Sequence, residues 1–579
     1  MAWTEQFSRI ITERNCLILL ASLFIILSIA VASAPYDPST DKADATTNDI
    51  WVEQYAHGVH HIPYDDWDYG ITQSVVVEYQ GQYVVVNEKG PGHVVMMLPF
   101  YIAGIGGLFP IIVMGLALLG TYMLGKRLFS WPAGFMASLF VLFNLVVIAM
   151  WHRYYWTDAS TMHLLVLAFW LLVEGNYWYN GKSLNPKTEN QPNQKEKIYG
   201  MGFCVLSGLA FGLSVSTRYP TGLLIFTFLA YLAGFYLLRA WPTLRAKDVH
   251  KALIEAKPML LLGLVFVLGL LLVLVPLMQY NSTYFGGPLN SGYDGTTLME
   301  FSKTETLDVR NTTAGWTSNI ASYLSTAFGN LFRLLPMFIS RMPALIFVPI
   351  GIYCLRVRKF KMFILLSWIG INFFTYLSLE WVTMYARPNL MPFEPRYWLP
   401  SLPAIAVLGG FGIYRLANWM AKRQAEENGW PPHEKITAKI LISGALVGIL
   451  VLWGAVPAAN YLQDPEVGDP HLQSQVQLVT TDMLLSTPYD FIESPVQLDA
   501  AIITHVSYQS IEIRSENSTL GSVEVNFMEW PTGELPEFHE DQHVWLSGMF
   551  TRPRAPPGMM PEPFIGIKHG TEDFVRLHP

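Results

Sequence analysis

Eleven long apolar runs, most of them 18 residues or more, dominate the first 460 residues of the chain. They lie near 15–34, 107–125, 131–150, 160–177, 199–217, 221–239, 258–280, 336–355, 361–380, 398–416 and 438–458. A helix of about 20 apolar residues spans the hydrocarbon core of a bilayer, which is roughly 30 Å thick. Charged residues make up only 14% of the chain, whereas soluble proteins have about 25%. We therefore predict a polytopic α-helical membrane protein with about eleven transmembrane helices.

Basic residues mark alternate connections between these runs. They are Lys126 and Arg127; Lys182, Lys187, Lys195 and Lys197; Arg239, Arg245 and Lys247; Arg356, Arg358, Lys359 and Lys361; and Lys422 and Arg423. Because Lys and Arg are enriched in cytoplasmic connections, this pattern predicts a multi-pass cell-membrane protein with a cytoplasmic N-terminus. The first run follows Arg9 and Arg14 without a clear cleavage site, which indicates an anchor. Sequons that begin at Asn281, Asn311 and Asn517 all fall on the predicted outer side.

After Asn460 the sequence changes to short β-rich runs. These runs are 497–506, 508–514, 520–527, 543–549 and 563–568. We predict a transmembrane domain over 1–460, with long outer loops at 35–106 and 281–335, and an extracytoplasmic β-rich domain over 461–579. Five short strands are typical of an OB-like barrel but also of a sandwich, and both alternatives remain open.

The C-terminal region is acidic. Residues 460–579 contain eighteen Asp and Glu against five Lys and Arg, so their net charge is −13 while the whole chain carries −8. This charge argues against a nucleic-acid partner. We expect the region to hold an acceptor molecule or to cover the outer face of the transmembrane domain.

Four motifs lie on the predicted outer side of the membrane. The first loop begins TNDIWVEQYAHG over 47–58 and continues to the turn EKGPG over 88–92. HRYYWTD over 152–158 comes directly before the fourth span, and PRYWLP over 395–400 enters the tenth. A further segment, with FGGPL over 285–289, follows the seventh span.

These motifs, in this order, resemble the GT-C glycosyltransferases. The resemblance is closest to the branch of dolichyl-phosphate-mannose protein mannosyltransferases and aminoarabinose transferases, in their prokaryotic forms, which include archaeal ones. It covers about residues 10–460. It implies a membrane glycosyltransferase that moves a sugar from a polyprenyl-phosphate donor to a protein, lipid or glycan acceptor outside the cytoplasm. Asp49 matches the acidic position after the first span of this family, and Asp158 resembles its second acidic site.

The resemblance also implies roles for individual residues. Asp49 is expected to be the general base for the acceptor, and Asp158 to orient the acceptor or a basic side chain. The departing lipid phosphate needs positive charge, and arginine offers a two-pronged fork for it. The candidates for phosphate binding are Lys89, Arg153, Arg218, Arg396 and Tyr397.

Two other patterns in the first loop have simpler interpretations. The first loop contains His57, His60, His61, Asp65 and Asp66, a set that includes ligand types for a divalent metal. We interpret them as loop residues and predict no metal and no cofactor. DWDYG over 66–70 is similar to the WWDYG motif of oligosaccharyltransferases, but that motif lies after the last span in those enzymes, so we interpret the match as coincidence.

The rival hypothesis is a transporter of lipids or solutes without enzymatic activity. Transporters place ionisable residues and interrupted helices near the middle of the membrane. Here the acidic and basic motifs gather at the outer face instead. This distribution favours the enzyme.

Overall fold

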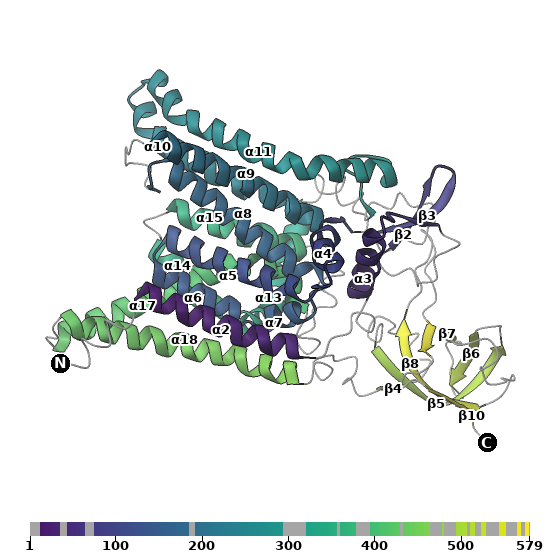
Figure 1. The fold of residues 1–579 in the computed structure, drawn as a ribbon. Coiled ribbons are helices and arrows are strands. Elements are labelled where there is room, and N and C mark those ends of the chain that lie inside the picture. The colour runs from purple at the N-terminus through teal and green to yellow at the C-terminus, as the bar shows by residue number, and fades with distance from the viewer. Residues whose placement is uncertain are drawn as a thin grey trace. The chain divides into compact units, whose positions relative to one another are not determined.

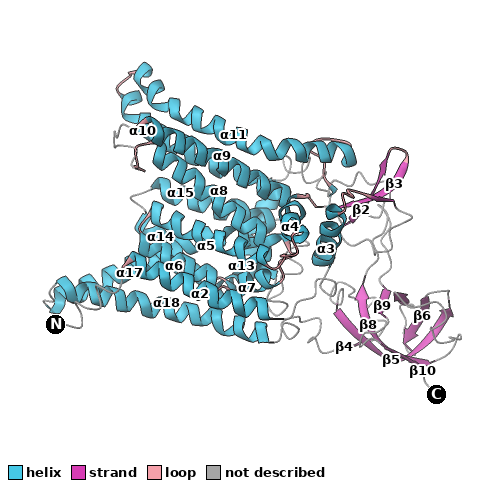
Figure 2. Cartoon of the chain, viewed as in Figure 1, coloured by secondary structure: helices cyan, strands magenta, loops and turns pink. Residues whose placement is uncertain are grey.

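The computed structural model describes residues 12–34, 43–63, 74–87, 89–184, 192–292, 320–355, 359–377, 394–428, 432–463 and seven strands between 477 and 577. The chain divides into two compact units. The first comprises 1–296 and 313–465, and the second comprises 297–312 and 466–579. Helices form nearly all of the first unit and strands form the second (Figure 2).

Among the described residues, nine helices are long and apolar enough to cross a membrane, and the number is eleven if two bent helix pairs each count as one span. The unbroken ones are α2 (Glu13–Ser33), α5 (Leu108–Leu128), α8 (Thr157–Tyr179), α9 (Gln194–Thr217), η2 (Tyr219–Leu224) with α10 (Ile225–Arg245), α11 (Val249–Phe285), α15 (Lys359–Leu377), η6 (Glu394–Ser401) with α17 (Leu402–Asn428), and α18 (Pro432–Gln463). The helices run side by side (Figure 1). The predicted α-helical membrane fold is therefore confirmed.

Two predicted spans are broken rather than straight. The run predicted at 131–150 forms α6 (Trp131–Leu142) and α7 (Leu145–His152), which meet at 58°. The run predicted at 336–355 forms the end of α13 (Ile320–Arg341), followed by η5 (Pro343–Phe347) and α14 (Val348–Leu355), with a bend of 107°. Pro343 opens η5, and a proline cannot continue the hydrogen bonding of the helix before it. Hydropathy alone does not report such a bend.

The predicted outer loop at 281–335 contains helix at both ends. Helix α11 continues to Phe285, and α13 already begins at Ile320. Asn281, the first residue of a predicted sequon, is buried in α11, where its side-chain oxygen accepts from the Tyr219 hydroxyl at 3.0 Å. It is therefore not a surface site for a glycan. Asn311 and Asn517 lie outside the described residues.

The first outer loop folds into helices and a small sheet. Its elements are α3 (Ala43–Ala56), β1 (Ile62–Pro63), β2 (Ser74–Tyr79), β3 (Gln82–Asn87) and α4 (Gly92–Ile102). Strands β2 and β3 form a two-residue hairpin at Gln80–Gly81, where both residues have positive φ angles of 54° and 79°, as a type I′ turn requires. Buried valines of the hairpin pack against Phe285 of α11. The loop is thus anchored on the end of a membrane helix.

Helix α8 lies inside the bundle. In its most apolar stretch of 18 residues, 83% of the residues are buried, compared with 17% in the corresponding stretch of α2. Small residues let its neighbours approach closely. A Cβ atom at Gly208 of α9 would lie 2.0 Å from the Phe266 carbonyl oxygen of α11. Likewise, a Cβ atom at Gly175 of α8 would lie 2.8 Å from the Gly200 carbonyl oxygen of α9. The backbones of α8 and α9, and those of α9 and α11, are therefore nearly in contact at these crossings.

The second unit contains β4 (Gln477–Val479), β5 (Ser494–Val506), β6 (Ser510–Ser515), β7 (Val523–Met528), β8 (His543–Thr551), β9 (Phe564–Lys568) and β10 (Phe574–Leu577). Five of them correspond to the five β-rich runs of the sequence. The order β5-β6-β7-β9-β8 closes on itself through a β8–β5 pairing, and β7 and β9 are parallel. This closed order is that of an OB barrel, one of the two alternatives left open by the sequence.

Candidate active site

Asp158 lies in the first turn of α8 and is completely buried. The chain reaches it through a tight turn in which the Trp156 amide donates to the Arg153 carbonyl at 3.0 Å. A carboxylate is favoured at a helix N-terminus because the helix dipole places partial positive charge there. A buried carboxylate nevertheless needs a positive partner, since losing water costs several kcal/mol per ion.

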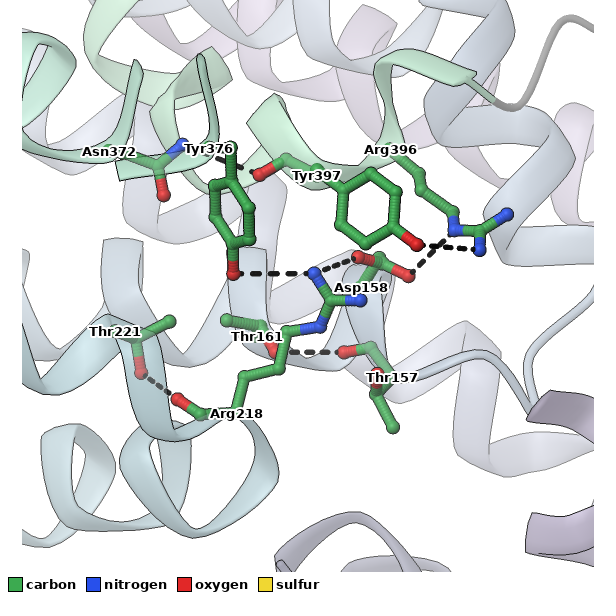
Figure 3. Close-up of polar contacts among 9 residues, drawn as sticks. All are labelled: Thr157, Asp158, Thr161, Arg218, Thr221, Asn372, Tyr376, Arg396 and Tyr397. Carbon is green, nitrogen blue, oxygen red and sulfur yellow. Dashed lines mark hydrogen bonds and ion pairs between the residues drawn. The ribbon is translucent and has the colours of Figure 1, made fainter. Parts of the chain in front are cut away.

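Arg218 supplies one partner. It ends α9 in an extended conformation, and the Thr221 hydroxyl donates to its carbonyl oxygen at 2.6 Å, which holds the sharp change of direction into η2. Its Nη1 atom lies 2.9 Å from Oδ1 of Asp158 and 3.4 Å from the Tyr376 hydroxyl of α15. The guanidinium group thereby links α8, α9 and α15 (Figure 3).

Arg396 supplies the second partner from η6. Its Nε atom lies 3.6 Å from Oδ2 of Asp158, which makes an ion pair without hydrogen-bond contact. Its Nη2 atom donates to the Tyr397 hydroxyl at 3.0 Å, and its guanidinium lies 4.0 Å from the ring centre of Trp156. Figure 3 shows Asp158 between the two guanidinium groups. Arg218, Arg396 and Asp158 are called the arginine pair site below.

The arginine pair site brings two cationic side chains to one carboxylate. Its ion pairs, as far as the structure describes them, join two guanidinium groups to one carboxylate. Tyr397 lies beneath both arginines, 4.7 Å from Arg218 and 4.8 Å from Arg396 between guanidinium carbon and ring centre. Both guanidinium groups are largely buried, since the side chains of Arg218 and Arg396 are 8% and 17% exposed. Guanidinium groups are the side chains that form short, charge-assisted hydrogen bonds to phosphate oxygens.

The predicted turn at 88–92 packs against the end of α9. A Cβ atom at Gly90 would lie 2.0 Å from the Ser216 carbonyl oxygen, and one at Gly92 would lie 2.0 Å from the Ser216 hydroxyl oxygen. The turn therefore touches α9 two residues before Arg218. Lys89 is buried in this turn, and its backbone amide donates to Oδ1 of Asn87 at 2.9 Å.

Helix α4, which follows the turn, is held to the first turns of α8. Nδ1 of His93 lies 2.9 Å from the Ser160 hydroxyl oxygen. Burial, followed by the neighbouring His163 and Lys89, lowers the pKa of His93 to about 3. His93 is consequently neutral at ordinary pH and acts as a hydrogen-bonding contact between α4 and α8.

Asp49 approaches the same end of α8 from α3. Nδ2 of the preceding Asn48 donates to the Tyr155 carbonyl at 2.8 Å, and the Tyr155 hydroxyl hydrogen-bonds to the Asp49 carboxylate. Burial, followed by the charge of Asp49, raises the pKa of Tyr155. The hydroxyl therefore stays protonated and acts as donor. Asp49 contacts the connection that leads directly into Asp158, while its side chain remains half-buried.

Most residues predicted from the sequence gather around the start of α8. One cluster contains Asp158, Arg218, Arg396 and Tyr397. Lys89 lies in a turn that packs against the end of α9, and Asp49 contacts Tyr155 just before α8. Arg153 is buried at the end of α7. Sequence reasoning missed Tyr376 and Trp156, both of which contact the arginines. Trp156 could have been found because it lies in the HRYYWTD motif, two residues before Asp158. Tyr376 lies in an apolar run outside the four motifs, so the sequence did not point to it.

The histidines of the first loop do not gather into a metal site in the described part of the chain. No group of three or more His, Cys, Asp or Glu that suits a metal occurs among those residues. His61 Nδ1 lies 3.1 Å from the Tyr284 hydroxyl, and His60 packs edge-on against Tyr55. Asp65, Asp66 and the DWDYG motif lie outside the described residues.

No protein-family model matches the chain, and no curated protein matches it in sequence. Among solved structures it is similar to the oligosaccharyltransferase AglB of Archaeoglobus fulgidus, in complex with an inhibitory peptide and a dolichol-phosphate, with 14% identity and a TM-score of 0.42 over 77% of this chain and 56% of that one. It is also similar to ArnT of Cupriavidus metallidurans bound to undecaprenyl phosphate, with 16% identity and a TM-score of 0.40 over 78% and 75% of the two chains.

The chain thus spans 56% of the length of that oligosaccharyltransferase. The apo form of the same ArnT gives 13% identity and a TM-score of 0.41, over 80% of this chain and 81% of that one. Both proteins belong to the GT-C membrane glycosyltransferases that the sequence motifs resemble. Because every one of these TM-scores is below 0.5, the likeness does not decide what this chain does, and its function is argued from the site.

Proposed function

We propose that this chain is a membrane glycosyltransferase that moves a sugar from a polyprenyl-phosphate donor to an extracytoplasmic acceptor. The observation that carries the proposal is the arginine pair site, in which Arg218 and Arg396 meet on the single carboxylate of Asp158. Two arginines that converge in a buried place between membrane helices suit a phosphate attached to a lipid. The reaction needs positive charge where the phosphate departs, and this site supplies it.

The phosphate contacts are assigned to Arg218 and Arg396, with Tyr397 as a ring beneath both guanidinium groups. Lys89 is assigned to the same phosphate because its turn packs against α9 next to Arg218. Arg153 adds positive charge from the end of α7. With these cations the proposed reaction needs neither metal nor cofactor, since the protein itself neutralises the leaving group.

Asp158 is assigned a positioning role. It is completely buried and pairs with both arginines, so its charge serves to hold them side by side. Without this carboxylate two guanidinium groups would repel each other. Of the two roles predicted for Asp158, these ion pairs favour orienting a basic side chain over orienting the acceptor.

Asp49 is assigned the role of general base. The acceptor hydroxyl gives its proton to the Asp49 carboxylate as its oxygen bonds to the anomeric carbon of the sugar. The bond between that carbon and the phosphate oxygen breaks, and its electron pair leaves with the polyprenyl phosphate. Asp49 suits this role because it is half-buried and oriented by the Tyr155 hydroxyl, whereas Asp158 is enclosed by arginines.

The proposal is tested first by binding. Full-length protein in detergent is titrated with polyprenyl monophosphate, and Arg396→Gln is compared with Arg415→Gln, which removes an exposed arginine farther along the same span. Loss of a charge-assisted phosphate contact costs roughly 1.5–3 kcal/mol, so we expect Arg396→Gln to bind about 10-fold to 100-fold more weakly. The control should bind as the wild type does. Equal affinities for all three proteins would remove the phosphate assignment.

Turnover provides the second readout. Surface glycoconjugates from cells that lack the gene are compared by mass spectrometry after complementation with each variant. Asp49→Asn should keep polyprenyl phosphate affinity but lower the glycosylated product by about 100-fold to 10,000-fold, because it removes the base alone. Glu53→Gln, an exposed acid one turn farther along α3, is the matched control and should restore the product. A normal product level with Asp49→Asn would mean that another carboxylate is the base.

A further inference from the structure

The two bent helix pairs meet at one place. Nδ2 of Asn144, in the break between α6 and α7, donates to the carbonyl oxygen of Arg341 at 2.7 Å, where α13 ends. Oδ1 of the same Asn144 accepts from the Val147 amide at 3.2 Å and so caps α7. A Cβ atom at Gly454 of α18 would lie 1.9 Å from the Phe143 carbonyl oxygen. Three segments that are distant in sequence are therefore locked together around these breaks.

A cavity of about 110 Å³ lies at this junction. Its lining is largely apolar and comes from α6, α7, α13, η5, α17 and α18; it includes Phe143, Leu145, Pro343, Leu450 and Trp453. Arg341 is the single charged residue in the lining, with Asn144 and Ser340 as its polar neighbours. The lining shares no residue with the arginine pair site. We call this space the Arg341 cavity.

Arg341 is half-buried there, and no acidic side chain in the described part of the chain pairs with it. This differs from Arg218 and Arg396, which share Asp158. An ionisable side chain among membrane helices is costly and is usually retained for a ligand or a partner. The Arg341 cavity is therefore complementary in charge to a small anion.

The cavity adjoins a face of α18 that points out of the bundle. Trp453, which lines the cavity, is 47% exposed, and Ile449 and Leu452 beside it are 61% and 63% exposed. In a membrane these side chains meet lipid tails. From η5 to the end of α14 the chain has 13 residues, or roughly 20 Å of helix, about two thirds of the hydrocarbon core. Since α14 ends beside the basic residues of the predicted inner connection, the cavity belongs to the outer half of the membrane.

We propose that the Arg341 cavity binds the phosphate headgroup of an anionic membrane lipid, whose tails lie along the exposed face of α18. The guanidinium group of Arg341 supplies the charge, and the Asn144 amide, which uses one N–H on the Arg341 carbonyl, has a second N–H to donate. The volume corresponds to roughly three or four water molecules, which fits a phosphate group but not a phosphate with its sugar. Basic pockets between membrane helices recognise lipid headgroups in this manner. The site is separate from the proposed donor site and does not depend on the proposed function.

The test measures lipid binding by the full-length protein after delipidation in detergent. Phosphatidylglycerol is the anionic probe and phosphatidylcholine the zwitterionic one, with bound lipids counted by native mass spectrometry and the midpoint of thermal unfolding followed in parallel. We expect phosphatidylglycerol to bind preferentially, and Arg341→Gln to weaken it about tenfold, the loss of one charge-assisted contact. Arg341→Lys should keep part of the affinity because it keeps the charge.

Two controls separate the headgroup site from a general loss of structure. Arg415→Gln removes an exposed arginine elsewhere and should leave lipid binding unchanged. Leu450→Phe keeps Arg341 but fills the cavity, so it should also weaken phosphatidylglycerol. Equal binding of phosphatidylglycerol to the wild type and Arg341→Gln would overturn the proposal. So would equal binding of the two lipids, or an unfolding shift of the same size with inorganic phosphate alone.

Discussion

At the scale of single residues, Asp158 joins three elements. Its carboxylate, in the first turn of α8, forms ion pairs with an arginine at the end of α9 and with another in η6. Arg218 reaches it from the end of α9 and Arg396 from η6. The two arginines are far apart in the sequence, and the carboxylate is what makes their proximity favourable. The stability of this part of the bundle should therefore depend on one negative charge.

Asp158→Asn tests this dependence. The substitution preserves the shape of the side chain but leaves two buried guanidinium groups on a neutral amide. Breaking a buried ion pair by removing one partner costs roughly 3–5 kcal/mol, so we expect a clearly lower midpoint of thermal unfolding. Glu427→Gln is the control, because it breaks the exposed pair with Arg423 at 2.8 Å, and such surface pairs contribute about 0–1 kcal/mol. Equal midpoints for both variants would show that Asp158 does not hold the arginines.

At the scale of elements, the turn over 88–92 is positioned by its glycines. Gly90 and Gly92 let the turn touch Ser216 at the end of α9, where any side chain would collide with backbone or hydroxyl atoms. This close contact explains why positions 90 and 92 of the EKGPG motif are glycines. It also fixes where Lys89 can lie relative to α9.

Gly90→Ala should consequently displace the turn. A Cβ atom 2.0 Å from a backbone oxygen cannot be accommodated by a side-chain movement, so the turn or the end of α9 must shift. We expect polyprenyl monophosphate to bind at least several-fold more weakly, measured in the same titration. Gly107→Ala, before α5, is the matched control because a Cβ atom there meets nothing within 4 Å. Wild-type affinity with Gly90→Ala would mean that the turn does not support the phosphate site.

At the scale of the whole molecule, the arrangement across the membrane remains a prediction from the distribution of Lys and Arg. In this arrangement the first loop, with Asp49 and the hairpin β2–β3, faces outward, and the connection between α8 and α9 faces the cytoplasm. Both locations offer exposed side chains, namely Gln82 in the hairpin and Lys182 after α8.

Cysteine labelling checks this topology. The three native cysteines, Cys16, Cys204 and Cys354, are first replaced by serine. In intact cells a membrane-impermeant maleimide should label Gln82→Cys, whereas Lys182→Cys should be labelled only after the membrane is opened, because the positive-inside rule places Lys182 in the cytoplasm. The reverse pattern would invert the topology and move the arginine pair site to the cytoplasmic face.

The sequence by itself determined the membrane class, the number of spans and the residue types of the site. Apolar length is a local property, since each run must match the bilayer thickness regardless of its neighbours. Asp158 and Arg396 stood at the ends of such runs and Asp49 in the loop after the first one, so their candidacy was also visible locally. The bends in two of the spans could not be predicted from the sequence, because a straight helix and a broken one can have the same hydropathy.

Only the tertiary structure decided which of these residues meet. The pairing of Asp158 with both arginines, the contact of Tyr376 with Arg218 and the cavity beside Arg341 all join segments distant in the chain. Such contacts depend on how closely helices approach, and that is set by glycines and shapes at their crossings rather than by the residues of one helix. The sequence therefore determined what crosses the membrane and which groups are available, whereas packing decided that Asp158 holds two arginines and that Arg341 lines an apolar cavity.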